Sequence, residues 1–468
     1  MKRFFLIFCI ISLLFSGIHA KKPENKSSAL EKAMSAFKFR LIGPAFMSGR
    51  IADIAVDPKD TKTWYLAVGS GGVWKTTNSG TTFKPVFDGE ASYSIGCITI
   101  DPRNSNVIWV GSGENVSGRH VGYGDGVYKS TDGGNSWTNM GLKSSEHIDK
   151  ILVHPKNTDI VYVAAEGPLW SSGGERGVYK STDGGKTWKE SLTVDKDTGA
   201  TDILMDPRDP DVLYAATHQR RRHVSALING GPGSAIYKSV DGGDNWKKIV
   251  RGLPSEDLGQ IALAISPQRP DVVYASVETS IRKITFYRSS DGGQNWKKKA
   301  SYNTPGTGPH YYQELYASPH QFDKIYSMEI NILMSHDGGG KWSKIREDNK
   351  HGDNHAIAFH PTEPDYLLCG SDGGLYETWD EGKTWRYISN LPVTQFYRIA
   401  LDNEKPFYNV LGGTQDNCTQ LGPSRTLRRD GIWNSDWRIT MGGDGYTCQF
   451  DPEDPNIMYT EAQVGYMI

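Results

Sequence analysis

Apolar and polar residues alternate along most of the chain in short runs, a pattern that predicts β-strands. Residues 51–68 hold an alternating apolar run, a turn marked by proline and a second apolar run. The same strand, turn and strand unit recurs at residues 98–110, 151–163, 203–215, 261–275 and 356–368. A unit that recurs in this way predicts an all-β fold built from repeated supersecondary structures.

A second motif, Ser-x-Asp-Gly-Gly-x-x-Trp, lies downstream of these units and gives the repeat its period. Its aspartates are Asp132, Asp183, Asp241, Asp291, Asp337 and, in a degenerate copy, Asp380, whereas Asn78 takes the same place in the first copy. Successive copies are 43 to 58 residues apart. One four-stranded propeller blade requires about 40–50 residues. We therefore predict a seven-bladed β-propeller of four-stranded blades over residues 39–395.

The residue types of this motif are those of a tight hairpin. The aspartate carboxylate accepts backbone N–H bonds inside the turn, and the glycines supply positive φ values. The tryptophan folds back between strands and buries a large apolar surface. We therefore interpret the six aspartates as structural residues.

The two ends of the chain fall outside this repeat. Lys2 and Arg3 precede an apolar stretch and the small-residue site Ile18-His19-Ala20, which predicts a signal peptide over residues 1–20. We expect a linker or short helix over residues 21–38 and a secreted or periplasmic protein without a membrane span after cleavage. Residues 396–468 supply either strands that close the ring or the beginning of a second propeller, and we interpret the chain as a truncated one.

Composition adds few constraints to this picture. Glycine provides 52 of the 468 residues and tryptophan 13, which suits a repeat of tight turns and aromatic anchors. The net charge of −2 gives no indication of nucleic-acid binding. Cys97 and Cys369 lie in strand-like runs and are expected to be buried thiols. Cys418 and Cys448 either pair or remain free, because export permits disulfides. No spacing predicts a metal site or a cofactor.

The repeated motif resembles the Asp-box of BNR-repeat proteins, which include sialidases, sortilin-type propellers and two-propeller xyloglucanases. Residues 38–468 as a whole resemble large exported bacterial BNR proteins of the sortilin-like type, which are often labelled glycosyl hydrolases. The segments that carry this resemblance include Gly111-Ser-Gly-Glu114-Asn115, His351-Gly-Asp353-Asn-His355, Gly412-Gly-Thr-Gln-Asp416-Asn417 and Gly442-Gly-Asp444-Gly445. The resemblance implies a propeller fold and a longer complete chain.

Propeller geometry separates the loops into two faces. The aspartate turns and Asp-Pro turns share one face, whereas the longer loops between second and third strands, and between blades, share the other. Function is more often found in such varied loops. The candidate ligand-binding residues there are Arg50, Glu114, Arg119, Arg220, Tyr312, His351, Asp353, His355 and Gln415.

Each of these candidates also has a structural interpretation. Arg220–Arg222 is typical of a solvated basic loop, with an anion contact as the alternative. The segment 351–355 lacks a third metal ligand, so a hydrogen-bonded loop is preferred. Glu114 is expected to order its glycine-rich loop rather than to donate a proton. Trp170 and Tyr312 either stack on a sugar or a peptide or pack within the protein.

Glycoside hydrolysis normally uses two carboxylates. By resemblance, the two-propeller xyloglucanases carry one catalytic aspartate before a Gly-Gly in the first blade and another in the second propeller. The matching stretch here, Val68-Gly69-Ser70-Gly71-Gly72, has no carboxylate, and Asp416 is a loose counterpart of the second aspartate. The arginine triad and tyrosine–glutamate pair of sialidases are not found as a set.

We therefore favour an exported, non-catalytic propeller that binds a peptide, a protein or a glycan at the channel mouth. The alternative is a glycoside hydrolase of the xyloglucanase type that acts on a polysaccharide through Asp416 and Glu114. A third hypothesis is a scaffold whose sides meet a partner. The expected partners are periplasmic or extracellular, with no nucleic acid, no cofactor and no metal.

Overall fold

The computed structural model describes residues 33–34, 40–42, 46, 49–116, 118, 121–280, 283–303 and 314–467. The chain divides into two units, residues 1–41 and residues 42–468. The predicted signal peptide lies outside the described residues, as does nearly all of the predicted linker or short helix. In the described part of the chain, no helix is long and apolar enough to cross a membrane.

The described strands between residues 51 and 387 form seven antiparallel sheets, each built from consecutive strands. The first sheet contains β1 (Ile51–Val56), β2 (Trp64–Val68), β3 (Gly72–Thr76) and β4 (Lys84–Pro85), and the second contains β5 (Ile95–Ile100), β6 (Ile108–Ser112), β7 (Val127–Ser130) and β8 (Thr138–Gly141). The third contains β9 (Ile148–Val153), β10 (Val161–Ala165), β11 (Gly177–Ser181) and β12 (Lys189–Leu192).

The remaining four sheets follow the same plan. The fourth contains β13 (Thr198–Met205), β14 (Leu213–Arg222), β16 (Ala235–Ser239) and β17 (Lys247–Ile249), with β15 (Leu227–Asn229) paired to β14. The fifth contains β18 (Ile261–Ile265), β19 (Val273–Ser280), β20 (Lys283–Ser289) and β21 (Trp296–Asn303). The sixth contains β22 (Leu315–Ala317), β23 (Ile325–Ser327), β24 (Leu333–Ser335) and β25 (Ser343–Lys344), and the seventh contains β26 (Asn354–Phe359), β27 (Leu367–Ser371), β28 (Gly374–Thr378) and β29 (Arg386–Tyr387).

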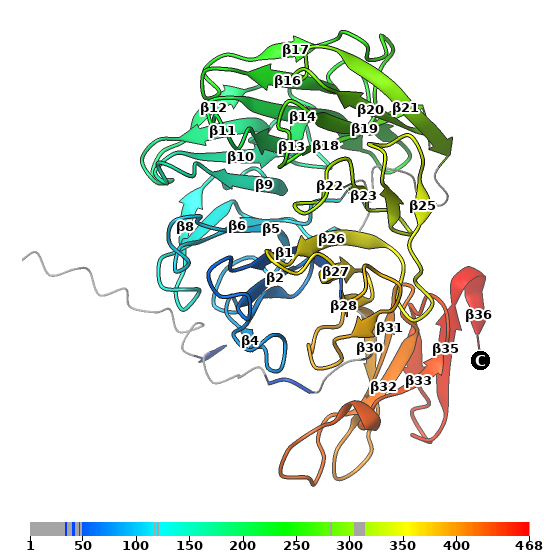
Figure 1. Cartoon of the computed structure of the whole chain (residues 1–468). Coiled ribbons are helices and arrows are strands. Elements are labelled where there is room, and N and C mark those ends of the chain that lie inside the picture. Colours follow the sequence, from blue (N-terminus) through cyan, green and yellow to red (C-terminus); the bar gives the residue numbers. More distant parts are fainter. Residues whose placement is uncertain are drawn as a thin grey trace, which may run out of the picture. The chain divides into compact units, whose positions relative to one another are not determined.

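Neighbouring sheets pack face to face around a ring. Each sheet from the first to the seventh shares a hydrophobic cluster with the next one. The ring returns on itself, because Ile54 and Leu66 of the first sheet pack with Leu368 and Leu375 of the seventh. Figure 1 shows the first strands toward the middle of this array and the fourth strands toward its rim. Second strands such as β2 and β10 are buried along their whole length because a sheet covers each face. The all-β propeller prediction is confirmed.

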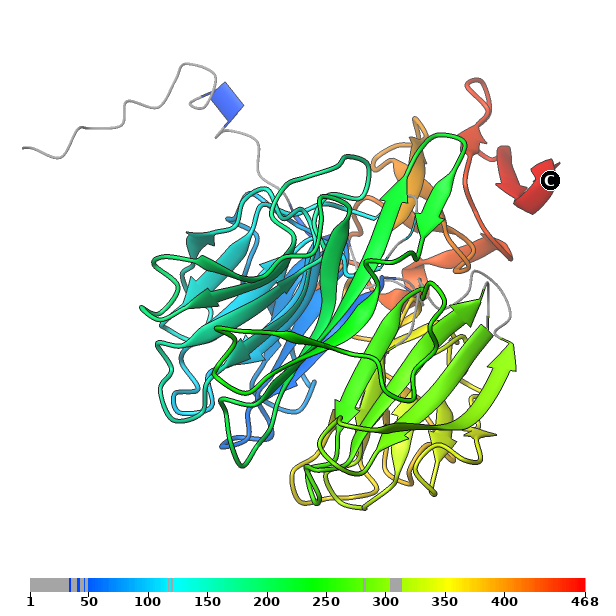
Figure 2. The same ribbon diagram turned by 90° about the horizontal axis from the view of Figure 1, so that it is seen from above.

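Residues 396–467 add two further sheets. The eighth contains β30 (Phe396–Leu401), β31 (Asn409–Thr414), β32 (Thr419–Pro423) and β33 (Arg438–Met441), and the ninth contains β34 (Cys448–Phe450), β35 (Met458–Ala462) and β36 (Tyr466–Met467). Two single-turn 3₁₀ helices, η1 (Asn434–Asp436) and η2 (Gln463–Gly465), lie between these strands. This segment, coloured orange to red, lies to one side of the seven sheets in Figures 1 and 2. None of its described strands pairs with the first sheet, so in the described chain this segment supplies no strand that closes the ring.

The repeated aspartate turns join the third and fourth strands of the blades. In the third sheet, the Asp183 carboxylate accepts hydrogen bonds from the Thr187 N–H at 2.9 Å and from the hydroxyls of Ser181 at 2.8 Å and Thr187 at 2.6 Å. Gly185 follows with φ of 89°, in the left-handed region that favours glycine. The Trp188 indole N–H donates to the Met140 carbonyl of the second sheet at 2.8 Å. Trp137, Trp246 and Trp385 likewise donate to the preceding blade, whereas Trp296 and Trp342 donate within their own turns.

The cysteines are all unpaired in the described chain. Cys97 and Cys369 are buried free thiols, as the sequence predicted. Cys418 and Cys448 are also free, so the disulfide between them that the sequence left open does not form. Cys448 instead packs in the core shared by the eighth and ninth sheets, which accounts for its burial.

Candidate functional site

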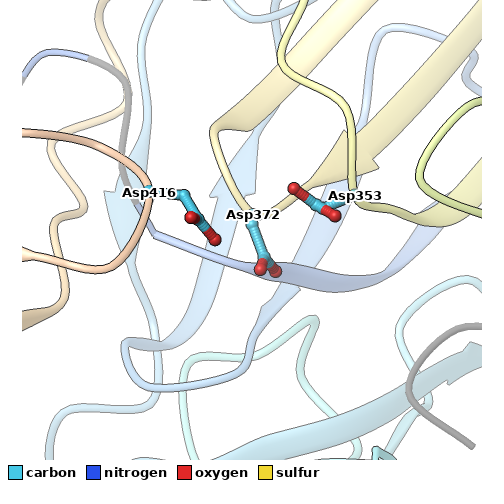
Figure 3. A group of neighbouring side chains, drawn as sticks. All are labelled: Asp353, Asp372 and Asp416. Carbon is cyan, nitrogen blue, oxygen red and sulfur yellow. The ribbon is translucent and has the colours of Figure 1, made fainter. Parts of the chain in front are cut away.

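Three aspartates from separate segments gather where the seventh and eighth sheets meet. Asp353 precedes β26, Asp372 lies in the turn between β27 and β28, and Asp416 lies in the turn between β31 and β32. Carboxylate oxygens of all three lie within 4.8 Å of one another (Figure 3). We call this group the aspartate cluster. It belongs to the loop face where the sequence placed function, because two of its members lie in loops between second and third strands.

Asp372 is the buried member of the cluster, and two cationic or hydrogen-bonding side chains hold it. Arg50 Nε donates to Asp372 Oδ1 at 2.6 Å, and His355 Nε2 lies 2.8 Å from the same oxygen. Burial by itself would raise the pKa of Asp372. The attraction of Arg50 and His355 and their hydrogen bonds outweigh burial, so the pKa lies below its usual value. Asp372 is therefore ionised across the physiological range.

Asp416 has acidic neighbours where Asp372 has cationic ones, and its side chain is exposed. Its backbone N–H donates to Asp444 Oδ1 at 2.5 Å, and its φ of 54° turns the backbone into the left-handed region. Desolvation raises the pKa of Asp416 to about 7, together with a hydrogen bond to Asp444 and repulsion from Asp444, Asp353 and Asp372. Asp416 thus carries a proton at pH values where most aspartates have lost theirs.

Arg50 also connects the cluster to Glu114 at the end of β6. The Glu114 carboxylate forms an ion pair with Arg50 and accepts a hydrogen bond from the Ser70 hydroxyl at 2.9 Å. Glu114 is completely buried. A Cβ on Gly69 would lie 3.1 Å from Glu114 Cδ, so this carboxylate occupies the space beside the first-blade turn that lacks an acid.

The sequence did not single out Asp372, although a pattern for it exists. Asp372 precedes Gly373-Gly374 in the turn between the second and third strands of the seventh sheet. The corresponding turn of the first sheet ends in Gly71-Gly72 and contains no carboxylate. The first blade therefore has no acid in this turn. The seventh blade, which packs against the first, supplies Asp372 instead.

The predicted site residues divide into four groups, of which Arg220 alone forms the fourth. Arg50, Glu114, Asp353 and His355 are brought together around Asp372 and Asp416, whereas Arg119 and Tyr312 lie outside the described residues. His351 and Gln415 flank the cluster: His351 Nδ1 lies 3.7 Å from Asp353 Oδ2, and Gln415 accepts a hydrogen bond from the Tyr397 hydroxyl at 2.8 Å. Gln415 is exposed and adjoins Asp416.

Arg220 belongs to a different network, and the solvated-loop interpretation of its neighbourhood is wrong. Arg220 and Arg222 lie in β14 and are 0% and 8% exposed. Arg220 forms an ion pair with the equally buried Glu166. Burial raises the pKa of Glu166 to about 7 against the attraction of Arg220 and Arg176. Arg220 thus enters the interior together with the buried carboxylate of Glu166.

A further set of carboxylates faces the middle of the ring. Asp53, Asp149, Asp202 and Glu314 line a cavity of about 110 Å³ together with Lys150. Asp53 accepts the Ile98 N–H and Asp202 accepts the Leu263 N–H, both at 2.9 Å, so each joins its own inner strand to that of the next sheet. These contacts assign the inner carboxylates a role in holding the blades together.

The three converging carboxylates of the aspartate cluster are the type of group that can hold a cation. Divalent cations prefer such oxygen ligands. Arg50 and His355 already contact Asp372, however, and Arg50 supplies a positive charge inside the site. His351 and His355 do not join these aspartates as a metal-ligating group among the described residues. The cluster also contains two neighbouring carboxyl groups whose pKa values are shifted in opposite directions.

Comparison with known proteins supports the propeller resemblance. Residues 125–253 match the family described as "Sortilin, neurotensin receptor 3". Over 251 residues the chain is 26% identical to the xyloglucanase Xgh74A of Acetivibrio thermocellus, which covers 49% of this chain and 28% of the relative. Over 396 residues it is 23% identical to a probable oligoxyloglucan-reducing end-specific xyloglucanase of Neosartorya fischeri, which covers 78% of this chain and 43% of the relative.

A solved structure shares the fold. The crystal structure of an ancestral GH74 enzyme matches with a TM-score of 0.52 at 16% identity, over 92% of this chain and 69% of that one. At this identity the likeness shows the fold alone. The matches span less than half the length of the two xyloglucanases above. The chain is similar to sortilin-like and xyloglucanase-like β-propellers.

Proposed function

We propose that this chain carries the catalytic carboxylates of a glycoside hydrolase that acts on a neutral polysaccharide of the xyloglucan type. Its relatives with the name xyloglucanase support this proposal, although they share only part of their length with the chain. The sequence favoured a non-catalytic propeller because the first blade lacks an acid. The convergence of Asp353, Asp372 and Asp416 removes that objection and favours the hydrolase hypothesis.

The observation that carries the proposal is the contrast in surroundings between two neighbouring carboxyl groups, with Asp372 beside Arg50 and Asp416 beside other aspartates. The pKa of Asp416 is raised to about 7, first by desolvation, whereas Arg50 and His355 hold the pKa of Asp372 below its usual value against its burial. Pairs of carboxyl groups whose environments separate their pKa values in this way perform acid and base roles in one site. Glycoside hydrolysis uses such a pair.

In the proposed mechanism, Asp416 is the general acid. Its proton passes to the glycosidic oxygen as the bond to the leaving sugar breaks. An acid with a pKa near the working pH combines a useful protonated fraction with a useful acidity. Asp372 remains ionised and stabilises the positive charge that develops on the sugar. The less buried Asp353 beside it takes the proton of the attacking water.

Glu114 receives a positioning role in this proposal. Its carboxylate is buried and engaged by Arg50 and Ser70. A general acid must reach the substrate, which a fully buried carboxylate cannot do. Glu114 instead orients Arg50 toward Asp372.

The charge of the site favours an uncharged substrate. Even with Asp416 protonated, Asp353, Asp372 and Asp444 outnumber the cation Arg50 at the cluster. A uronic acid ring would experience repulsion from these carboxylates, whereas a neutral glucan would not. We therefore expect the substrate to be a neutral glucan and not an acidic glycan.

The test measures reducing ends released from xyloglucan by the full chain and by the Asp416→Asn variant. Removing the acid should lower the rate by about 10²- to 10⁴-fold, the usual contribution of general acid catalysis. Asp430→Asn is a matched control, because Asp430 is an exposed aspartate in a distant loop. Its rate should equal that of the parent chain.

A pH profile sharpens this test. Activity should fall as the pH rises through about 7, because Asp416 then loses its proton. Asp444→Asn removes a negative charge beside Asp416, so it should shift this alkaline limb to lower pH. Binding of xyloglucan without hydrolysis at any pH would contradict the proposal and favour the non-catalytic hypothesis.

A further inference from the structure

A second feature of the loop face presents a tryptophan on a rigid support. Trp170 lies in the loop between β10 and β11 and is 49% exposed. Of the two other strongly exposed tryptophans among the described residues, Trp433 is covered by Arg428 at 4.4 Å and Trp379 packs against Tyr366 at 4.3 Å between ring centroids. Trp170 has no such ring or cation contact in the described part of the chain. Its indole is available to a ligand.

The support is a buried arginine that ties the loop together. Arg176 is 2% exposed and donates to the carbonyls of Glu166, Pro168, Ser171 and Gly173, three of these bonds measuring 2.8 Å. Leu169, next to Trp170, is fully buried, and its carbonyl accepts the Arg222 N–H at 2.8 Å. The residues on both sides of Trp170 are therefore fixed, which reduces the entropy lost when a ligand binds.

Hydrogen bonds connect this loop to the aspartate cluster. The Glu166 N–H donates to the His147 carbonyl at 3.0 Å, and His147 Nδ1 contacts the Glu114 carbonyl at 2.8 Å. Burial lowers the pKa of His147 to about 3, so this histidine is neutral and Nδ1 carries the hydrogen that the carbonyl accepts. Glu114 in turn pairs with Arg50, which holds Asp372. One continuous set of contacts therefore runs from the cluster to the Trp170 loop.

We propose that Trp170 is a remote subsite that stacks on a pyranose ring of the same neutral glucan chain whose bond lies at the aspartate cluster. This inference rests on the proposed function and specifies an extended substrate rather than a short glycoside. The flat face of a neutral sugar ring matches an exposed indole, and such a contact needs no charged partner. Trp170 belongs to the third sheet and the aspartate cluster to the seventh and eighth, so we expect a substrate that contacts both to be a chain of several sugars.

The test measures glucan binding and not hydrolysis. The full chain with Asp416→Asn is titrated calorimetrically with xyloglucan and with cello-oligosaccharides of increasing length. Affinity should increase with chain length, and adding Trp170→Ala should remove that increase. For the longest oligosaccharide the affinity should fall about three- to tenfold, the contribution expected of one aromatic contact.

Two further variants separate stacking from folding. Trp379→Ala removes an exposed tryptophan from the Asp-box face and should bind like the parent. Trp170→Phe keeps an aromatic face and should recover part of the affinity. Thermal unfolding of all variants shows whether the fold is retained.

The outcomes distinguish this inference from the proposed function. Loss of binding in Trp170→Ala supports the subsite even if the parent chain hydrolyses nothing. Affinity within twofold of the parent at every length overturns the subsite, even if Asp416→Asn abolishes hydrolysis. The absence of binding to every glucan at millimolar concentration also overturns it.

Discussion

Aspartates on the two faces of this propeller differ in their partners and in the direction of their pKa shifts. On the Asp-box face, Asp183 is partly exposed, and its pKa is lowered to about 2, chiefly by hydrogen bonds from the Thr187 hydroxyl and N–H. On the opposite face, the pKa of Asp416 is raised to about 7 by desolvation and by its aspartate neighbours. Both side chains lie in turns between strands. The partners that surround the carboxylate, and not its residue type or its exposure, decide its protonation.

The two environments also differ in origin. An Asp-box obtains its donors from within eight consecutive residues, so each copy is complete in itself. The aspartate cluster combines residues more than 300 positions apart, because Arg50 of the first sheet donates to Asp372 of the seventh. A local motif can be repeated, whereas the cluster exists only where the ring brings its first and seventh sheets together.

The largest expected effect comes from breaking the nonlocal site at Arg50. Arg50→Ala leaves Glu114 and Asp372 buried without their shared cation, and such a loss typically costs about 3–5 kcal/mol of unfolding free energy. The exposed Arg346, paired with Asp348, is the matched control, and its replacement by alanine should cost about 0–1 kcal/mol. Urea unfolding measures both. Equal losses of unfolding free energy in the two variants would show that Arg50 contributes no more than a surface ion pair.

A smaller effect is expected from removing one local turn. Asp291→Ala deletes hydrogen bonds from Ser289 and Asn295, which should cost about 1–2 kcal/mol. Burial opposes the shift, but these bonds lower the pKa of Asp291. The stabilisation is therefore present above the unfolded value near 4 and is lost as the pH falls through the folded pKa. Urea unfolding at pH 7 and at pH 2 checks this, and hydrolytic activity should remain that of the parent.

The smallest expected effect is a gain in stability, whereas the two substitutions above lower it. The folded pKa of Asp416 lies above its unfolded value, so folding favours the protonated form, and that stability is lost as the pH rises from about 4 to 7. Asp416→Asn should therefore stabilise the fold at pH 8, by about 1 kcal/mol because solvent screens an exposed carboxylate. The gain should disappear at pH 4. A thermal unfolding series across this range measures it, and destabilisation at pH 8 would refute the assigned environment.

The sequence predicted the fold far better than the site. Strand alternation and the spacing of the aspartate turns indicated the repeated four-stranded sheets, and the interpretation of Cys97 and Cys369 as buried thiols was also confirmed. Arg220 was misjudged, because three consecutive arginines resemble a solvated loop until the strand pairing of β14 and the burial of Glu166 are known. Asp372 was missed because its relevance depends on its distance from Arg50 and Asp416.

The sequence by itself determined the blade, because the donors, glycines and tryptophan of each aspartate turn lie within a few residues of one another. Local hydrogen bonds and alternating burial need no information from elsewhere in the chain. Only the tertiary structure decided which carboxylates meet and which carry protons. A pKa depends on desolvation and on charges within a few ångströms, and those neighbours come from the first, seventh and eighth sheets.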